Sequence, residues 1–127
     1  MTLMLDSAVL MWWQFNSPRL SGQARAALDE AQILLVSPVS VWELAIKAGS
    51  GKLPVDTDFW PALEVRLARP PFKLIEVTLE DAISAGFLPR HHGDPLDRML
   101  VAQAIARRVP LVSPDAALDA YAVQRIW

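Results

Sequence analysis

A chain of 127 residues, of which 53% are hydrophobic, can bury one sizeable core, and we expect a single domain over residues 1–127. A net charge of −2 argues against a general basic nucleic-acid binder, and the absence of cysteine excludes disulfide and thiol chemistry and fits a cytoplasmic protein. Asp6 ends the first apolar run and no basic segment precedes it, so neither a signal peptide nor a membrane span is predicted.

Short apolar runs alternate with helix signals along the chain. In order, we predict a strand at 2–5, helices at 7–15 and 22–31, a strand at 33–36, helices at 38–49 and 56–67, a strand at 72–77, helices at 79–86 and 94–107, a strand at 110–112, a short helix begun by Ser113-Pro114 and a strand at 121–127. The unbroken aliphatic run at 33–36 is typical of a parallel strand covered on both faces. This alternation predicts an α/β fold with a mainly parallel, twisted sheet of about four to five strands flanked by helices.

Four acidic residues lie where an apolar run passes into a helix. They are Asp6, Glu43, Asp97 and Asp115. The carboxyl ends of parallel strands and the helix starts beside them share one edge of the sheet, where ligands bind. Two like charges about 4 Å apart repel each other by on the order of 4 kcal/mol at an effective dielectric constant of about 20. Because a divalent cation with oxygen ligands relieves such repulsion, the four acids are candidate metal ligands.

Each acid also has an ordinary explanation, because Asp is a good N-cap and acids near helix N-termini interact favourably with the helix dipole. Asp6 could cap the helix at 7–15, and Asp115 could lie in the first turn of the helix that Ser113 begins. Asp94 and Asp97 have the spacing of a capping box, and the cap is the favoured role for Asp94.

Glu43 is the acid that a cap or surface role explains least well. It lies beside the apolar stripe of its helix, and an i, i+4 pair with Lys47 would contribute only about 0.3 kcal/mol. Taken together, the four acids favour a metal site, because helix caps need no particular partners elsewhere in the chain.

Six stretches that span nearly the whole length form an ordered set of motifs. They are LMLDSAVLMWW (3–13), LSGQAR (20–25), SPVSVWELAIK (37–47), GKL (51–53), LPRHHGDPLDRMLVAQA (88–104) and LVSPD (111–115). In these stretches the chain resembles the PIN-domain nucleases, and specifically the VapC-type toxins of bacterial toxin–antitoxin pairs. Two departures are modest. Many relatives have Thr-His where this chain has Ser7-Ala8, and Leu96 stands where relatives often carry Phe.

The resemblance implies an endoribonuclease that depends on Mg²⁺ or Mn²⁺, forms a homodimer and is inhibited by a small cognate antitoxin. The family's acids fall on Asp6, Glu43, Asp97 and Asp115. Asp6 and Asp97 would hold the main ion, and Glu43 and Asp115 would complete its shell or bind a second ion. Either Glu43 or Asp97 would accept the proton of the attacking water. Hard oxygen ligands suit Mg²⁺ or Mn²⁺ better than zinc, since the chain has no Cys and no spaced pair of His.

The other polar residues near these motifs carry weaker signals. Ser7 is either a helix-start hydroxyl or a ligand for a metal-bound water. His91 and His92 are expected to be solvated in a surface loop, since adjacent His residues do not form a zinc motif. Most Lys and Arg side chains are expected to be solvated, and Arg98, next to Asp97, is the best candidate for contact with an RNA phosphate.

Two other functional classes remain open at this stage. A phosphotransfer domain would use Asp6 as its nucleophile, but this gives Glu43 no role. A catalytically inert PIN-like interaction module would keep the fold and lose the chemistry, and nothing in the four acids indicates such decay.

Overall fold

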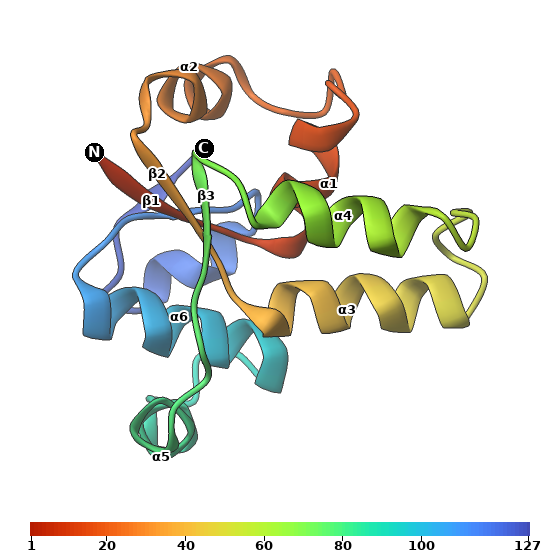
Figure 1. The fold of residues 1–127 in the computed structure, drawn as a ribbon. Coiled ribbons are helices and arrows are strands. Elements are labelled where there is room, and N and C mark those ends of the chain that lie inside the picture. Colours follow the sequence, from red (N-terminus) through yellow and green to blue (C-terminus); the bar gives the residue numbers. More distant parts are fainter.

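The computed structural model describes the whole chain from Met1 to Trp127 and contains one five-stranded sheet (Figure 1). The strands are β1 (Thr2–Leu5), β2 (Ile33–Val36), β3 (Phe72–Leu74), β4 (Leu111–Val112) and β5 (Arg125–Ile126). Their order across the sheet is β3-β2-β1-β4-β5, and every neighbouring pair is parallel. The predicted α/β fold with a mainly parallel sheet is therefore confirmed.

Six α-helices and one 3₁₀-helix connect the strands. They are α1 (Ser7–Gln14), α2 (Gly22–Glu30), α3 (Pro38–Gly49), α4 (Phe59–Leu67), α5 (Leu79–Phe87), α6 (Pro95–Arg107) and the 3₁₀-helix η1 (Ala116–Ala120). Several begin at the predicted caps: the side chain of Ser21 accepts the N–H of Ala24, and that of Ser37 accepts the N–H of Val39. None of these helices combines the length and apolar character needed to cross a membrane.

Alternate residues of the central strand face opposite layers of helices. Leu3 and Leu5 pack with residues of α1, α2 and α4, whereas Met4 packs with residues of α6. All three are completely buried, and each such side chain contributes about 1.5–3 kcal/mol of hydrophobic stabilisation. In Figure 1, α5 lies outside α6, away from the sheet. The packing on both faces fixes β1, and therefore the residue that follows it, Asp6.

Three predicted segments are shorter than expected, each for a local reason. Helix α4 begins at Phe59 because the side chain of Asp56 accepts the N–H groups of Asp58 and Phe59 and forms a turn. Strand β3 stops at Leu74, which pairs with the last residue of β2, so no partner strand continues beyond it. The predicted strand at 121–127 is reduced to Arg125–Ile126 because β4, its only neighbour, has two residues.

Since all five strands are parallel, the residues that follow them lie along one edge of the sheet. Asp6 follows β1, Ser37 follows β2 and Ser113 follows β4. Main-chain hydrogen bonds join Asp6 to β4 and Ser113 to β5. The carboxyl edge of the sheet thus supplies a rigid base for polar side chains, the usual location of ligand sites in such folds.

Candidate metal centre

Three of the four predicted acids converge at the carboxyl edge of the sheet. Asp6 lies at the end of β1, Glu43 in the second turn of α3 and Asp97 in the first turn of α6. One carboxylate oxygen of each lies within 4.8 Å of those of the other two. Residues separated by more than half of the chain therefore share a single acidic centre.

Asp6 both caps a helix and faces this centre. One carboxylate oxygen, Oδ1, accepts the N–H of Ser7 at 2.6 Å, and the other, Oδ2, accepts the hydroxyl of Ser113 at 2.6 Å. Asp6 and the two serines are buried. The two hydrogen bonds fix the orientation of the Asp6 carboxylate, and the ordinary cap role coexists with a place in the cluster. Sequence reasoning missed Ser113 as a partner of Asp6, because the hydroxyl looked like a helix cap.

Glu43 is linked to Asp6 through Ser7. The Ser7 hydroxyl donates a hydrogen bond to Oε2 of Glu43 and lies 3.3 Å from Oδ1 of Asp6. The other Glu43 oxygen, Oε1, lies 3.9 Å from Nζ of Lys47, whose side chain is 44% exposed. No other Lys or Arg nitrogen lies within 4.0 Å of the four predicted acids. The protein itself thus supplies little positive charge to the centre.

Asp97 does not form the capping box that its spacing with Asp94 suggested. Asp94 is the N-cap of α6 and accepts the N–H of Leu96 at 2.8 Å. The N–H of Asp94, which a capping box would give to Asp97, goes instead to Nδ1 of His92 at 3.0 Å. The Asp97 carboxylate is therefore available to the acidic centre.

The electrostatics of Asp97 reflect these surroundings. Burial raises the pKa of the Asp97 carboxyl, and the nearby charges of Asp6, Asp94 and Glu43 raise it further, to about 7, while His92 acts in the opposite direction. A negative charge at Asp97 is thus unfavourable unless a cation is supplied.

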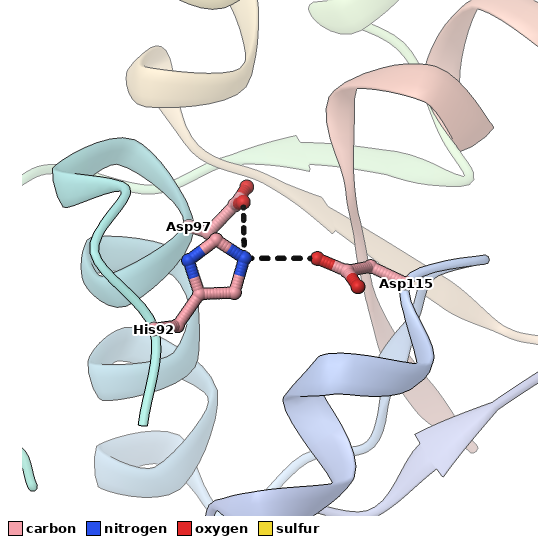
Figure 2. Close-up of side chains that lie close together, drawn as sticks. All are labelled: His92, Asp97 and Asp115. Atoms are coloured by element: carbon pink, nitrogen blue, oxygen red, sulfur yellow. Dashed lines mark hydrogen bonds and ion pairs between the residues drawn. The ribbon is translucent and has the colours of Figure 1, made fainter. Parts of the chain in front are cut away.

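Asp115 joins the cluster through His92 (Figure 2). Nε2 of His92 lies 3.1 Å from Oδ2 of Asp115 and 3.3 Å from Oδ2 of Asp97. The other Asp115 oxygen caps η1 by accepting the N–H of Ala117 at 3.0 Å. The predicted helix start at Ser113-Pro114 is therefore wrong. Ser113 instead accepts the N–H of Asp115 at 3.1 Å, and the helix begins two residues later with Asp115 as its cap.

His92 was expected to be a solvated surface residue, and this expectation is wrong. Its side chain is only 20% exposed and contacts Asp94, Asp97 and Asp115. The one available signal was its position two residues before a helix N-cap, from which an imidazole can accept the N–H of the cap residue.

Arg98 is engaged within the chain. Its guanidinium donates hydrogen bonds to the carbonyl oxygens of Ala85 at 3.0 Å, Leu88 at 2.8 Å and Pro89 at 2.9 Å. It thereby holds the connection between α5 and α6, a role that was not predicted for this candidate contact to an RNA phosphate.

The donor set fits a hard divalent cation. The converging atoms of Asp6, Glu43 and Asp97 are all carboxylate oxygens, the ligands that Mg²⁺ and Mn²⁺ prefer. Nδ1 of His92 accepts a main-chain N–H, so the proton of the neutral imidazole is on Nε2, and that nitrogen has no lone pair for a metal. The centre formed by Asp6, Glu43 and Asp97 therefore offers oxygen ligands alone.

These features define a class of protein: α/β proteins that have a parallel sheet and an acidic centre at the carboxyl edge of that sheet. The family model of the PIN domain matches residues 3–124. Ribonuclease VapC22 of Mycobacterium tuberculosis is 33% identical over 121 residues, which cover 94% of this chain and 92% of that protein. The chain belongs to the PIN domain family.

Solved structures agree with this fold. VapBC2 from Rickettsia felis, bound to a promoter DNA fragment, has a TM-score of 0.71 at 16% identity, covering 98% of this chain and 97% of that one. DNA-bound VapBC from Salmonella typhimurium has a TM-score of 0.72 at 15% identity, covering 98% and 96%. FitAcB from Neisseria gonorrhoeae has a TM-score of 0.69 at 17% identity, covering 98% and 96%. At these identities the similarity concerns the fold, and it confirms the PIN-like architecture.

Proposed function

We propose that this protein is a metal-dependent endoribonuclease of the VapC type, which hydrolyses phosphodiester bonds in RNA. The observation that carries this proposal is the convergence of oxygens from Asp6, Glu43 and Asp97 within 4.8 Å of one another. The similarity to a protein named as a ribonuclease over almost the whole chain supports RNA as the substrate.

Asp6 and Asp97 would hold a Mg²⁺ or Mn²⁺ ion, with Glu43 and Asp115 completing the shell or holding a second ion. When bound, such an ion supplies an activated water and positive charge for the scissile phosphate. Asp6 contributes a carboxylate whose orientation is already fixed by Ser7 and Ser113, so little rearrangement is needed on binding. Glu43 or Asp97, the two carboxylates that accept the fewest hydrogen bonds within the chain, would accept the proton of that water.

The two rival functions find less support. A phosphotransfer reaction with Asp6 as nucleophile would give Glu43 no role, yet Glu43 converges with Asp6 and Asp97. An inert interaction module would have no need for an Asp whose pKa is raised to about 7 by burial and by neighbouring acids, an arrangement that lowers stability at neutral pH.

We further propose that a small antitoxin protein neutralises the activity. The solved structures of similar fold include a toxin–antitoxin complex from Klebsiella pneumoniae, with a TM-score of 0.65 at 16% identity. Coexpression with the neighbouring gene product, followed by copurification, tests this partner.

A homodimer is the oligomeric state that the surface of α5 supports best. Leu79, Ile83 and Phe87 recur every four residues on this helix and are exposed, with Phe87 87% exposed. Glu80 near the start of α5 and Arg90 just beyond its end carry opposite charges, so two antiparallel copies would pair them. Phe87→Ser should give a monomer in sedimentation velocity, and an unchanged dimer would exclude this face.

Cleavage of RNA by the purified protein tests the proposed function directly. We expect cleavage with Mn²⁺ or Mg²⁺, none with excess chelator, and loss of cleavage in Asp6→Asn. Asp29→Asn makes the same change at an exposed position on α2 and should leave cleavage intact. Expression of the chain alone should also slow growth, and Asp6→Asn should relieve this. Full cleavage in chelator would overturn the proposal.

A further inference from the structure

We propose that His92 positions the carboxylates of Asp97 and Asp115 for the metal ion without binding the ion itself. The inference rests on the proposed metal centre and assigns one residue a role within it. Figure 2 shows the imidazole between the two carboxylates, with Nε2 3.3 Å from Oδ2 of Asp97 and 3.1 Å from Oδ2 of Asp115.

The direction of the hydrogen bond to Asp115 follows from the other ring nitrogen. The main-chain N–H of Asp94 can only donate, and it lies 3.0 Å from Nδ1 of His92, so Nδ1 accepts. The neutral ring then carries its proton on Nε2 and donates it toward the two carboxylates. His92 therefore offers Asp97 and Asp115 a hydrogen-bond donor rather than a lone pair for a metal.

The two carboxylates depend on this donor because they come from separate parts of the chain. Asp97 lies in the first turn of α6, whereas Asp115 follows β4 and has a side chain that is 36% exposed. No other side-chain donor bonds to Oδ2 of Asp115 in the structure. The N–H on Nε2 hydrogen-bonds to Asp115 and lies 3.3 Å from Asp97, so its positive end sets the separation of the two carboxylates and offsets part of their mutual repulsion.

The position of His92 is itself fixed by the loop that carries it. Arg98 donates to the carbonyl oxygens of Leu88 and Pro89 and lies 3.4 Å from that of His92. The same guanidinium lies 3.3 Å from the hydroxyl of Tyr121, which is buried against α6. Arg98 therefore acts on the carboxylates indirectly, by holding the main chain from which His92 projects.

Hydrogen bonds to metal-binding carboxylates typically change metal affinity by about 10- to 100-fold. Two substitutions separate the two functions of the ring, which are to accept the N–H of Asp94 through Nδ1 and to donate the N–H on Nε2. The amide nitrogen of His92→Gln lies where Nε2 does and can donate to the carboxylates. His92→Asn is shorter: its oxygen can accept the N–H of Asp94, but it reaches neither Asp97 nor Asp115.

The experiment titrates the full-length protein with Mn²⁺ in a calorimeter and measures thermal unfolding of each variant without metal. We expect His92→Asn to weaken Mn²⁺ binding by about 10- to 100-fold, and His92→Gln to stay within about 3-fold of the wild type. Equal loss in both variants, or no loss in His92→Asn, would overturn the donor role. Loss in His92→Gln alone would do so as well.

Arg98→Lys provides a second route to the same conclusion if His92→Asn does not fold. Lys cannot bridge several carbonyl groups as a guanidinium does, so Mn²⁺ binding should weaken and the Mn²⁺ electron paramagnetic resonance spectrum should broaden. Unchanged Mn²⁺ affinity and an unchanged spectrum in Arg98→Lys would contradict the role of Arg98 in holding the loop that positions His92. A wild-type protein that takes up no Mn²⁺ would contradict the proposed function itself, a result distinct from normal uptake in the His92 variants.

Discussion

Two aspartates occupy the same position in consecutive helices and have opposite electrostatics. Asp81 is the third residue of α5 and Asp97 the third residue of α6, and their side chains are 5% and 15% exposed. Asp81 closes a capping box with Thr78: it accepts the Thr78 N–H at 3.1 Å, and its own N–H goes to the Thr78 hydroxyl at 3.0 Å. Asp97 makes no such bond to its cap residue.

The partners supplied by other segments complete the contrast. Burial raises the pKa of Asp81, but hydrogen bonds from Arg107, Thr78 and Gln103 outweigh this effect and hold the pKa below its usual value. Burial raises the pKa of Asp97 as well, but its nearby acids raise it further, to about 7. An acid in the first turn of a helix is therefore structural or functional according to the charges that the tertiary fold brings to it.

The largest expected effect comes from exchanging the two aspartates for asparagine one at a time. Asp97→Asn should lower the rate of RNA cleavage by at least about 1,000-fold, equivalent to on the order of 4 kcal/mol, because it removes a charge that holds the ion. Asp81→Asn should leave the cleavage rate of the folded protein within about 3-fold. Rates measured under single-turnover conditions, with circular dichroism as the check on folding, decide this. Similar cleavage rates in the two variants would show that Asp97 has no greater role in cleavage than Asp81.

Stability should respond in the opposite order. Asp81→Asn removes the carboxylate that Arg107, Gln103 and Thr78 bind and should lower the free energy of unfolding by about 1–3 kcal/mol, since hydrogen bonds to a buried charged group are lost. Metal-free Asp97→Asn should be at least as stable as the wild type at pH 8. Urea denaturation of both variants in excess chelator measures these differences. A destabilised Asp97→Asn would mean that the carboxylate contributes to the fold.

The sequence predicted much of this arrangement because much of it is local. Apolar runs gave β1 and β2 at their observed bounds, and Ser and Thr caps gave the starts of α2, α3 and α5. The parallel order of strands then placed Asp6, Glu43 and Asp97 at one edge, where the structure has them.

The remainder depended on contacts between distant segments. The spacing of Asp94 and Asp97 is that of a capping box, and the position of His92 two residues before the cap is the one signal that its ring takes the N–H of Asp94 instead. The hydrogen bonds of Arg98 were not predicted for a similar reason, because the carbonyl groups that its guanidinium binds belong to the end of α5 and the residue after it. The four acids were recognisable because helix starts and strand ends mark them, whereas no such mark identifies the side chains that orient them.

The pH dependence of stability should differ in sign for the two aspartates. The folded pKa of Asp97, about 7, exceeds its unfolded value of 3.8, so its stabilising contribution is fully present below pH 3.8 and is lost as the pH rises past 7. The lowered pKa of Asp81 gives a contribution that is present above pH 3.8 and is lost in acid.

Metal-free wild type should therefore lose about 1–2 kcal/mol of unfolding free energy between pH 5.5 and pH 8, beyond any change seen in Asp97→Asn. Mn²⁺ should restore this stability at pH 8, since it binds the ionised carboxylates of the folded state. Urea denaturation at a series of pH values, with and without Mn²⁺, provides the measurement. Parallel pH profiles for wild type and Asp97→Asn would show that the Asp97 carboxyl titrates normally.

The smallest effect is expected at Lys47, the one cation near the acidic centre. Its Nζ lies 3.9 Å from Oε1 of Glu43 and its side chain is 44% exposed, so solvent screens the pair and its contribution to stability is less than about 0.5 kcal/mol. Lys47→Gln should therefore leave the unfolding free energy nearly unchanged. It should tighten Mn²⁺ binding by no more than about 3-fold at low salt, because a cation that competes for Glu43 is removed. The pair of Arg107 with Asp81, by contrast, contributes more to the free energy of unfolding. A large loss of Mn²⁺ affinity in Lys47→Gln would mean that Lys47 orients Glu43 rather than merely lying beside it.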